Sequence, residues 1–193
     1  MSIAEKVRAS ARPETPAEAS AVVELWWEAG PKLWFAKDDA FDGRFRERFA
    51  ADYAAAADGR LSQWQTTPEG ALALVLLLDQ YPRNSFRGSP GMYATDELAR
   101  EVAAEAIADG FDRLIADDLA VFLYLPFGHS ESLADQQRCV QLVERLGEPS
   151  LSHARHHRDI IRRFGRFPHR NPILGRTMRP EEQEYLDNGG YKG

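Results

Sequence analysis

Apolar residues recur every three or four positions along most of the chain, as on one face of an α-helix, and no segment alternates like a β-strand. Glycine or proline separates the helical stretches. We therefore predict an all-α fold of about eight helices. Short turns should make neighbouring helices antiparallel, which gives stacked helical hairpins. The expected helices cover 15–29, 38–58, 67–81, 95–109, 114–125, 130 or 132 to 146, 150–164 and 180–186.

Several helix ends carry sequence signals. Thr15 and Glu18 have the spacing of a capping box. Pro82 and Pro126 should end the helices that precede them, because proline disfavours helical backbone at the residue before it. On the second helix, aromatic residues recur every four positions and predict a face in the core. These residues are Phe41, Phe45, Phe49 and Tyr53.

The composition is that of one globular domain over residues 1–193, and the polar residues 1–13 should form a flexible tail. A net charge of −6 argues against nucleic acid or an anionic membrane as partner.

The longest apolar run, 71–78, is too short to cross a bilayer, and the first residues lack the apolar region of a secretory signal. The single cysteine, Cys139, cannot form an internal disulfide and favours a reducing cytoplasmic location.

Positive charge is concentrated near the carboxyl end of this acidic chain. Residues 153–179 contain eight arginines and four of the five histidines, with Asp159 as the only acid. Such a stripe persists where acids from elsewhere, or an anionic ligand, lie against it. On the helix expected at 150–164, His157 falls on or near the apolar face, where a histidine is commonly a neutral core residue.

Two polar sites follow strongly apolar segments. Asp79 comes directly after the most apolar run, so it should be buried and should pair with Arg83 or with an arginine near the carboxyl end. His129 and Glu131 follow the apolar helix that ends near residue 125, where a cleft would place them. Glu131 also suits a helix amino terminus without any functional role.

Four stretches resemble the bacterial domain-of-unknown-function 924 family over about residues 17–186: LDQYPRNSFRG, FLYLPFGHSES, HRDIIRRFGRFPHRNPILGR and TMRPEEQEYL. The resemblance implies an all-helical fold of the tetratricopeptide-repeat-like superfamily, and it brings no activity, substrate or cofactor. The motif residues that it implies are Asp79, Gln80, Pro82, Arg83, Asn84, His129, Ser130, Glu131, His157, Arg158, Arg166, His169, Arg170 and Asn171.

The residue types favour a groove that binds a small anion or a peptide carboxylate, because guanidinium groups match carboxylate and phosphate and histidine and asparagine add directed hydrogen bonds. We expect no metal, because the pair His153 and His157 lacks further ligands at a recognisable spacing, and no cofactor. The candidate site residues are Asp79, Arg83, Asn84, His129, Glu131, His157, Arg158, Arg166, His169, Arg170 and Asn171.

Two alternatives stay open at this point. The same histidines, carboxylates and arginines could hydrolyse or transfer a phosphate or acyl group, although no residue identifies itself as a nucleophile. They could also form a purely structural network in which Asp79, Glu131 and Asp159 neutralise the arginines. Whether the protein is an enzyme, and its oligomeric state, are not predicted.

Overall fold

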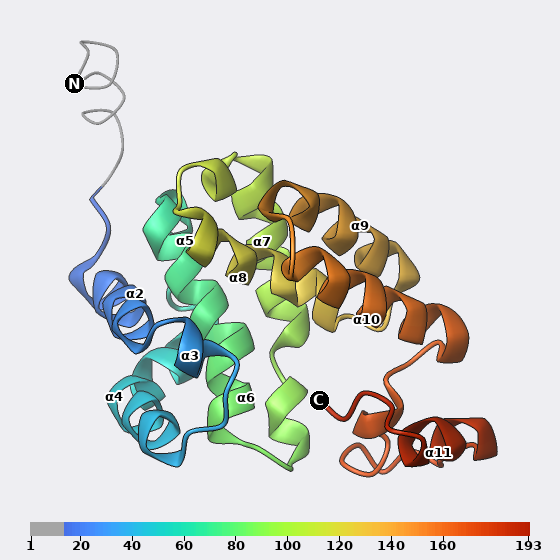
Figure 1. The fold of residues 1–193 in the computed structure, drawn as a ribbon. Helices are drawn as coiled ribbons and strands as arrows, with labels where there is room; N and C mark the ends of the chain where they lie inside the picture. Colours follow the sequence, from blue (N-terminus) through green and yellow to red (C-terminus); the bar gives the residue numbers. More distant parts are fainter. Residues whose placement is uncertain (1–13) are drawn as a thin grey trace.

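A computed structural model describes the fold of residues 14–193 (Figure 1). Within these residues the backbone forms helices and turns and no β-strand, so the predicted all-α class is confirmed. The expected tail at 1–13 lies outside the described residues. None of the described helices is long and apolar enough to span a membrane.

The α-helices are short to medium in length, and brief 3₁₀ turns connect several of them. Their bounds are α2 Ala17–Ala29, α3 Pro31–Trp34, α4 Asp39–Ala57, α5 Pro68–Val75, α6 Tyr81–Ser85, α7 Asp96–Ala108, α8 Asp117–His129, α9 Leu133–Val143, α10 Ser150–Phe164 and α11 Pro180–Asp187. The range predicted for α10, 150–164, is confirmed. The apolar face of this helix is pronounced, and Gly165 ends it in the left-handed conformation.

Successive helices pack against one another, which agrees with the predicted stack of hairpins. Helix α7 contacts α8, α8 contacts α9 and α9 contacts α10, while α5 lies between α2 and α7 (Figure 1). The tetratricopeptide-repeat-like assignment stays a prediction.

The main core is aromatic at the end formed by α2, α4 and α8. The Trp26 ring has no exposed surface and lies 5.4 Å from the Phe45 ring and 5.2 Å from the Phe122 ring, between centroids. Phe41 and Phe49 are buried on the same face of α4, so the predicted aromatic stripe does belong to the core. Such ring pairs add about 0.5–1.5 kcal/mol each beyond the apolar area that they bury.

A second, smaller apolar cluster holds the carboxyl-terminal segment against α10. Four buried residues make it up, and Tyr185 and Tyr191 cover it. The four are Ile160, Ile161, Phe164 and Phe167. The arginine-rich segment at 163–176 is therefore folded back onto the helices, and Figure 1 shows it leading into α11 below α10.

The prediction that a helix ends before Pro82 was wrong. Residues Leu76–Gln80 form a π turn, after which α6 begins and carries Pro82 in its first turn. A widened turn and a proline both leave backbone carbonyls without helical partners. Here Thr95 Oγ1 donates to the carbonyl of Leu78 at 2.6 Å, and Arg83 Nη1 donates to the carbonyl of Asp79 at 2.7 Å. Side chains thus replace the helical bonds, and Asp79 lies within a continuous helical path rather than at a helix end.

Pro126 does not end its helix either, because α8 continues to His129. Gln136 Nε2, on α9, donates to the carbonyls of Gly128 and Ser130 at 2.7 Å each. These bonds satisfy the last turn from outside the helix.

The predicted capping box at Thr15 is absent. Helix α2 begins at Ala17 without a side-chain cap, and Thr15 Oγ1 instead donates to Thr67 Oγ1 at 3.1 Å. Thr67 caps α5 by accepting from Gly70 N, so the two helix starts are tied together.

Candidate functional site

Asp79 is the most deeply buried acid among the predicted site residues. It has no exposed surface, because the π turn directs it inward from the apolar run. Its Oδ1 atom lies 2.8 Å from His129 Nδ1 and 3.1 Å from Arg83 Nη1, and Gln80 Nε2 donates to Oδ2 at 2.6 Å. The predicted pairing with an arginine is confirmed, and the partner is Arg83.

The neighbours of Asp79 keep it ionised. Burial by itself raises the pKa of a carboxyl, but the charge of Arg83 and the hydrogen bonds from His129 and Gln80 outweigh burial and lower the pKa of Asp79 to about 2. Arg83 is the largest of the causes that lower the pKa of Asp79, and His129 comes next.

Arg83 joins two elements through two carboxylates. Besides Asp79, it holds Asp96 with paired bonds, from Nη1 at 2.8 Å and from Nη2 at 3.1 Å. Asp96 was not among the predicted site residues, because an acid at the start of α7 suits the helix dipole and needs no further explanation. The charge of Arg83 is therefore fully used by the protein itself.

His129 is the last residue of α8 and presents one free ring nitrogen. Nδ1 faces Asp79, whereas Nε2 has no hydrogen-bond partner within residues 14–193, and 16% of the side chain is exposed. Burial and the nearby Arg83 lower the pKa of His129 and outweigh the carboxylate of Asp79, which acts in the opposite direction. The ring is thus a neutral base at pH 7.

Arg170 lies beside His129 and has few partners. It comes from the 3₁₀ turn Pro168–Arg170, and only 9% of its side chain is exposed. Its Nη2 donates to the carbonyl of His129 at 2.9 Å, while the nearest carboxylate, Asp96, is 3.8 Å from Nη1. The guanidinium carbon lies 4.6 Å from the ring centroid of Tyr93 and 4.5 Å from that of Phe167.

Polar atoms without a partner cluster at this turn. Within the described part of the chain, His169 Nδ1, Arg170 Nε and Asn171 Oδ1 are buried and make no hydrogen bond. Buried polar atoms in proteins are usually satisfied, so three in consecutive residues distinguish this turn as a candidate site for water or a ligand.

Two histidines next to this turn are held neutral. The rings of His157 and His169 both contact the Tyr191 ring, at 4.7 Å and 5.1 Å between ring centroids. Burial, together with the other histidines and Arg170, lowers the pKa of His157 to about 3. Burial and the charge of Arg170 lower the pKa of His169 to about 4. Tyr191, which covers both, carried no signal in the sequence because it follows a polar, glycine-containing stretch.

Glu131 fastens the arginine-rich segment to the amino-terminal side of α9. It accepts hydrogen bonds from Arg176 Nη1 at 2.9 and 2.8 Å and from the backbone N of Phe167 at 2.9 Å. This is a structural tie, which also orients Phe167 beneath Arg170.

Arg166 and Asn171 belong to a different network, centred on Glu182. This carboxylate is fully buried and accepts from Arg166 Nε at 2.6 Å, Arg179 Nη2 at 2.8 Å and Asn171 Nδ2 at 3.1 Å. The arginines hold the pKa of Glu182 far below its usual value. Glu182 was not among the predicted site residues, although an acid in the first turn of α11, close in sequence to so many arginines, could have indicated a partner for them.

Two further predicted residues are not brought into the site. Arg158 pairs with Asp159 on the exposed side of α10, at 2.9 Å. The side chain of Asn84 makes no hydrogen bond within residues 14–193. The structure therefore gathers Asp79, Arg83, His129, His157, His169 and Arg170, and places the remaining candidates in structural contacts or outside.

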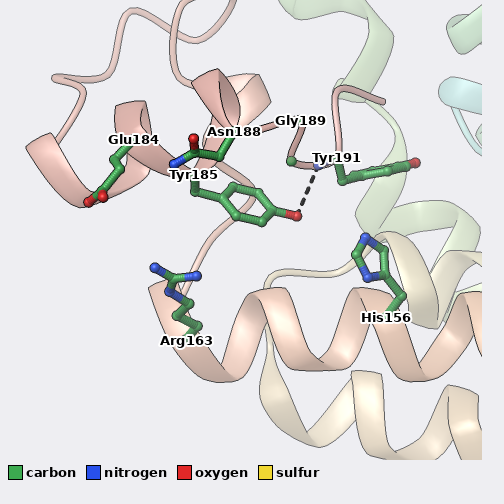
Figure 2. A pocket seen from close by; sticks show the side chains of 8 residues that line it. His156, Arg163, Glu184, Tyr185, Asn188, Gly189 and Tyr191 are labelled. Atoms are coloured by element: carbon green, nitrogen blue, oxygen red, sulfur yellow. Dashed lines mark hydrogen bonds between the residues drawn. The ribbon is translucent and has the colours of Figure 1, made fainter.

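A hollow of about 510 Å³ lies next to this cluster, between α10 and the segment that follows α11. Figure 2 shows Arg163 and His156 projecting from α10 toward Tyr185 and Tyr191, with the hydrogen bond from Tyr191 N to Tyr185 Oη at 2.9 Å. No predicted site residue lines this hollow, whose remaining walls are Glu184, Asn188, Gly189 and Gly190.

Comparison with known proteins identifies relatives without a known activity. A family model described as "Bacterial protein of unknown function (DUF924)" matches residues 22–190. A solved structure of a protein of unknown function, ATU0120 from Agrobacterium tumefaciens, shares 53% sequence identity and has a TM-score of 0.89. The match covers 91% of this chain and all of that one. No curated protein matches the chain.

Proposed function

The chain belongs to the DUF924 family of bacterial proteins of unknown function, and we propose that it binds a small anionic ligand, or the carboxylate of a peptide, at Arg170. The observation that supports the proposal is the state of the Arg170 guanidinium, which is nearly buried and makes a single hydrogen bond, to a backbone carbonyl. Removing an arginine from water is costly unless charge and hydrogen bonds compensate.

The other arginines of residues 163–179 differ in this respect. Arg166, Arg176 and Arg179 each have a carboxylate oxygen within hydrogen-bonding distance, and Arg163 is exposed to water. The structural network that the sequence left open thus accounts for those residues, and it leaves Arg170 with a carboxylate no closer than 3.8 Å. Burial and the like charge of Arg83 lower the pKa of Arg170, so a bound anion would relieve an unfavourable electrostatic environment.

The surroundings favour a ligand with a flat, forked anionic group. The rings of Tyr93 and Phe167 both pack against the guanidinium group, and a planar guanidinium group suits the paired oxygens of a carboxylate or phosphate. His169 Nδ1 and Arg170 Nε, both unpaired, supply directed contacts. Asn171 points to Glu182 and is outside this group. A reducing, cytoplasmic setting remains part of the proposal because the only cysteine is buried and unpaired.

Thermal unfolding in the presence of inorganic phosphate, acetate and a short peptide with a free carboxylate tests the proposal. A ligand at ten times its Kd stabilises by about 1.4 kcal/mol, which raises the Tm of a chain of this size by roughly 3–6 °C. We expect Arg170→Gln to abolish the shift. Arg155→Gln removes the same charge from an exposed position of α10 and should keep it.

Arg170→Lys retains the charge without the fork and should shift Tm by less than the native protein. Circular dichroism separates loss of binding from loss of fold in each variant. If none of the three anions raises Tm while Arg170→Gln destabilises the protein, Arg170 is structural and the proposal is wrong.

A further inference from the structure

We propose that His129 and Asp79 form a general-base pair and that the protein hydrolyses an ester or amide that carries a carboxylate or phosphate. This inference rests on the proposed function, because Arg170 would hold the anionic group of the substrate. It adds an activity to binding and assigns separate roles to the two groups.

The geometry of the pair is that of an oriented base. Asp79 Oδ1 lies 2.8 Å from His129 Nδ1, and Arg83 and Gln80 fix the carboxylate from its other sides. An ionised carboxylate only accepts hydrogen bonds, so Nδ1 must carry the proton. In a neutral ring the lone pair is then on Nε2, which has no partner within residues 14–193.

The charges around His129 support this protonation state. Arg83 and Arg170 face it from α6 and from the 3₁₀ turn, and Asp79 and Asp96 face it from the π turn and α7. His157 and His169 are the other titratable groups nearby, and both are neutral. An imidazolium formed during a reaction would be stabilised by Asp79, which the neutral ring already contacts.

Arg170 places a substrate beside the base. Its Nη2 is bonded to the backbone carbonyl of His129 itself, so an anion on the remaining guanidinium edge lies next to this residue. The aromatic rings of Tyr93 and Phe167 flank the same position. Binding energy from the anionic group would thus hold the acyl carbon near Nε2, which is the usual contribution of a remote anchor.

The reaction needs only water as a second reactant. Nε2 takes one proton from water while the water oxygen bonds to the acyl carbon and the carbonyl electron pair moves to its oxygen. When that pair returns, the bond to the leaving oxygen or nitrogen breaks, and the leaving group takes the proton from Nε2. The products are an acid and an alcohol or amine, and His129 ends neutral, as it began.

Hydrolysis of mono-4-nitrophenyl succinate, with neutral 4-nitrophenyl acetate for comparison, tests the activity. We expect the native protein to accelerate the charged ester more than the neutral one. His129→Gln should lower the rate at least 100-fold while keeping the Tm shift with phosphate. Arg170→Gln should lose the preference for the charged ester. His153→Gln, an exposed histidine on α10, should leave the rate unchanged.

Asp79 is a positioning residue, and its role has a readout that needs no substrate. Nitrogen-15 spectra of the imidazole should show His129 protonated at Nδ1 in the native protein, and Asp79→Asn should change that tautomer. A native His129 protonated at Nε2, or no hydrolysis of either ester above the buffer rate, would overturn the inference. A phosphate-induced Tm shift that persists in that case leaves the binding proposal standing, whereas its absence rejects both.

Discussion

Asp79 and His129 lie fifty residues apart in the chain, yet their side chains meet at 2.8 Å. The contact joins the π turn to the carboxyl end of α8, and Arg83 extends it to Asp96 on α7. One buried carboxylate thus links three elements, which makes it the natural first target for mutation.

Asp79→Asn should destabilise the protein by about 3 kcal/mol, because it removes one charge from a buried ion pair and forces an amide into a shell of donors. Arg83 keeps its ion pair with Asp96 in this variant, so the cost should lie at the lower end of the range for broken buried pairs. Urea unfolding measures the change, and Asp39→Asn, at a side chain that is 88% exposed, is the control with an expected effect below about 0.5 kcal/mol. Equal effects of the two substitutions would mean that Asp79 is not held as described.

The close approach of α8 to α9 and α10 should make Gly128→Ala destabilising by about 1–3 kcal/mol. A Cβ at this position would lie 3.1 Å from Cys139 Sγ. Adding Cys139→Ala removes the sulfur, so the double variant should lose less stability than the sum of the single variants. Gly43→Ala, in a helical position with no atom within 4 Å of the new Cβ, should not destabilise. Additive effects at 128 and 139 would show that the helices are farther apart.

Glu182→Gln should loosen the segment that follows α10. The substitution removes the charge that Arg166 and Arg179 share, and it should cost less stability than the Asp79 substitution because both guanidinium groups are partly exposed to water. Relative to the native protein, the variant should show a larger increase in backbone amide hydrogen exchange in residues 165–190 than in α5 or α8. Glu181→Gln, at a half-exposed position of the same helix turn, serves as control. Uniform loss of protection across the chain would count against a local role.

Stability should fall with acidity between about pH 6.5 and pH 4. His157 and His169 have folded pKa values of about 3 and 4, whereas an unfolded histidine has a pKa of about 6.5. Above pH 6.5 these two histidines are mostly unprotonated in both the folded and the unfolded protein, so they do not lower the stability. Below it the unfolded chain takes up protons that the folded protein does not, and each histidine costs at most about 1.4 kcal/mol per pH unit.

Urea unfolding at a series of pH values checks this slope. His157→Gln and His169→Gln should each flatten it, whereas the exposed His153→Gln should not. Asp79 affects stability at lower pH than the histidines do. Because its folded pKa is lowered, its contribution to stability is complete above about pH 4 and is lost as the pH falls toward 2. A flat profile between pH 6.5 and 4 would show that the two histidines are accessible to protons.

Local signals in the sequence predicted most helices but failed where distant side chains intervene. Helix α10 follows from its own apolar spacing and from Gly165. At Pro82, however, the helical path continues because Thr95 bonds the carbonyl of Leu78, which the proline leaves without a helical donor. At Pro126 the helix runs on to His129, and Gln136 of α9 bonds carbonyls at its end. No pattern near either proline indicates such a partner.

The candidate site was predictable in part for the same reason. The burial of Asp79 and its need for an arginine follow from the apolar run before it. The sequence does not show which buried arginine lacks a carboxylate partner, because an excess of arginines over acids does not determine which of them form ion pairs. Glu182, Glu131 and Asp96 neutralise their partners only after folding, and Arg170 is distinguished from Arg166 by that outcome alone.

The widened turn at Leu76–Gln80 also constrains how the chain can change length. An α-helix advances about 100° per residue, so deleting or inserting one residue there would rotate everything after it by that angle. Asp79 and Arg83, which lie four residues apart, would turn together away from His129 on α8 and Asp96 on α7. Single-residue gaps should therefore be absent from this stretch among functional relatives, even where the identities of Leu76 and Leu77 vary.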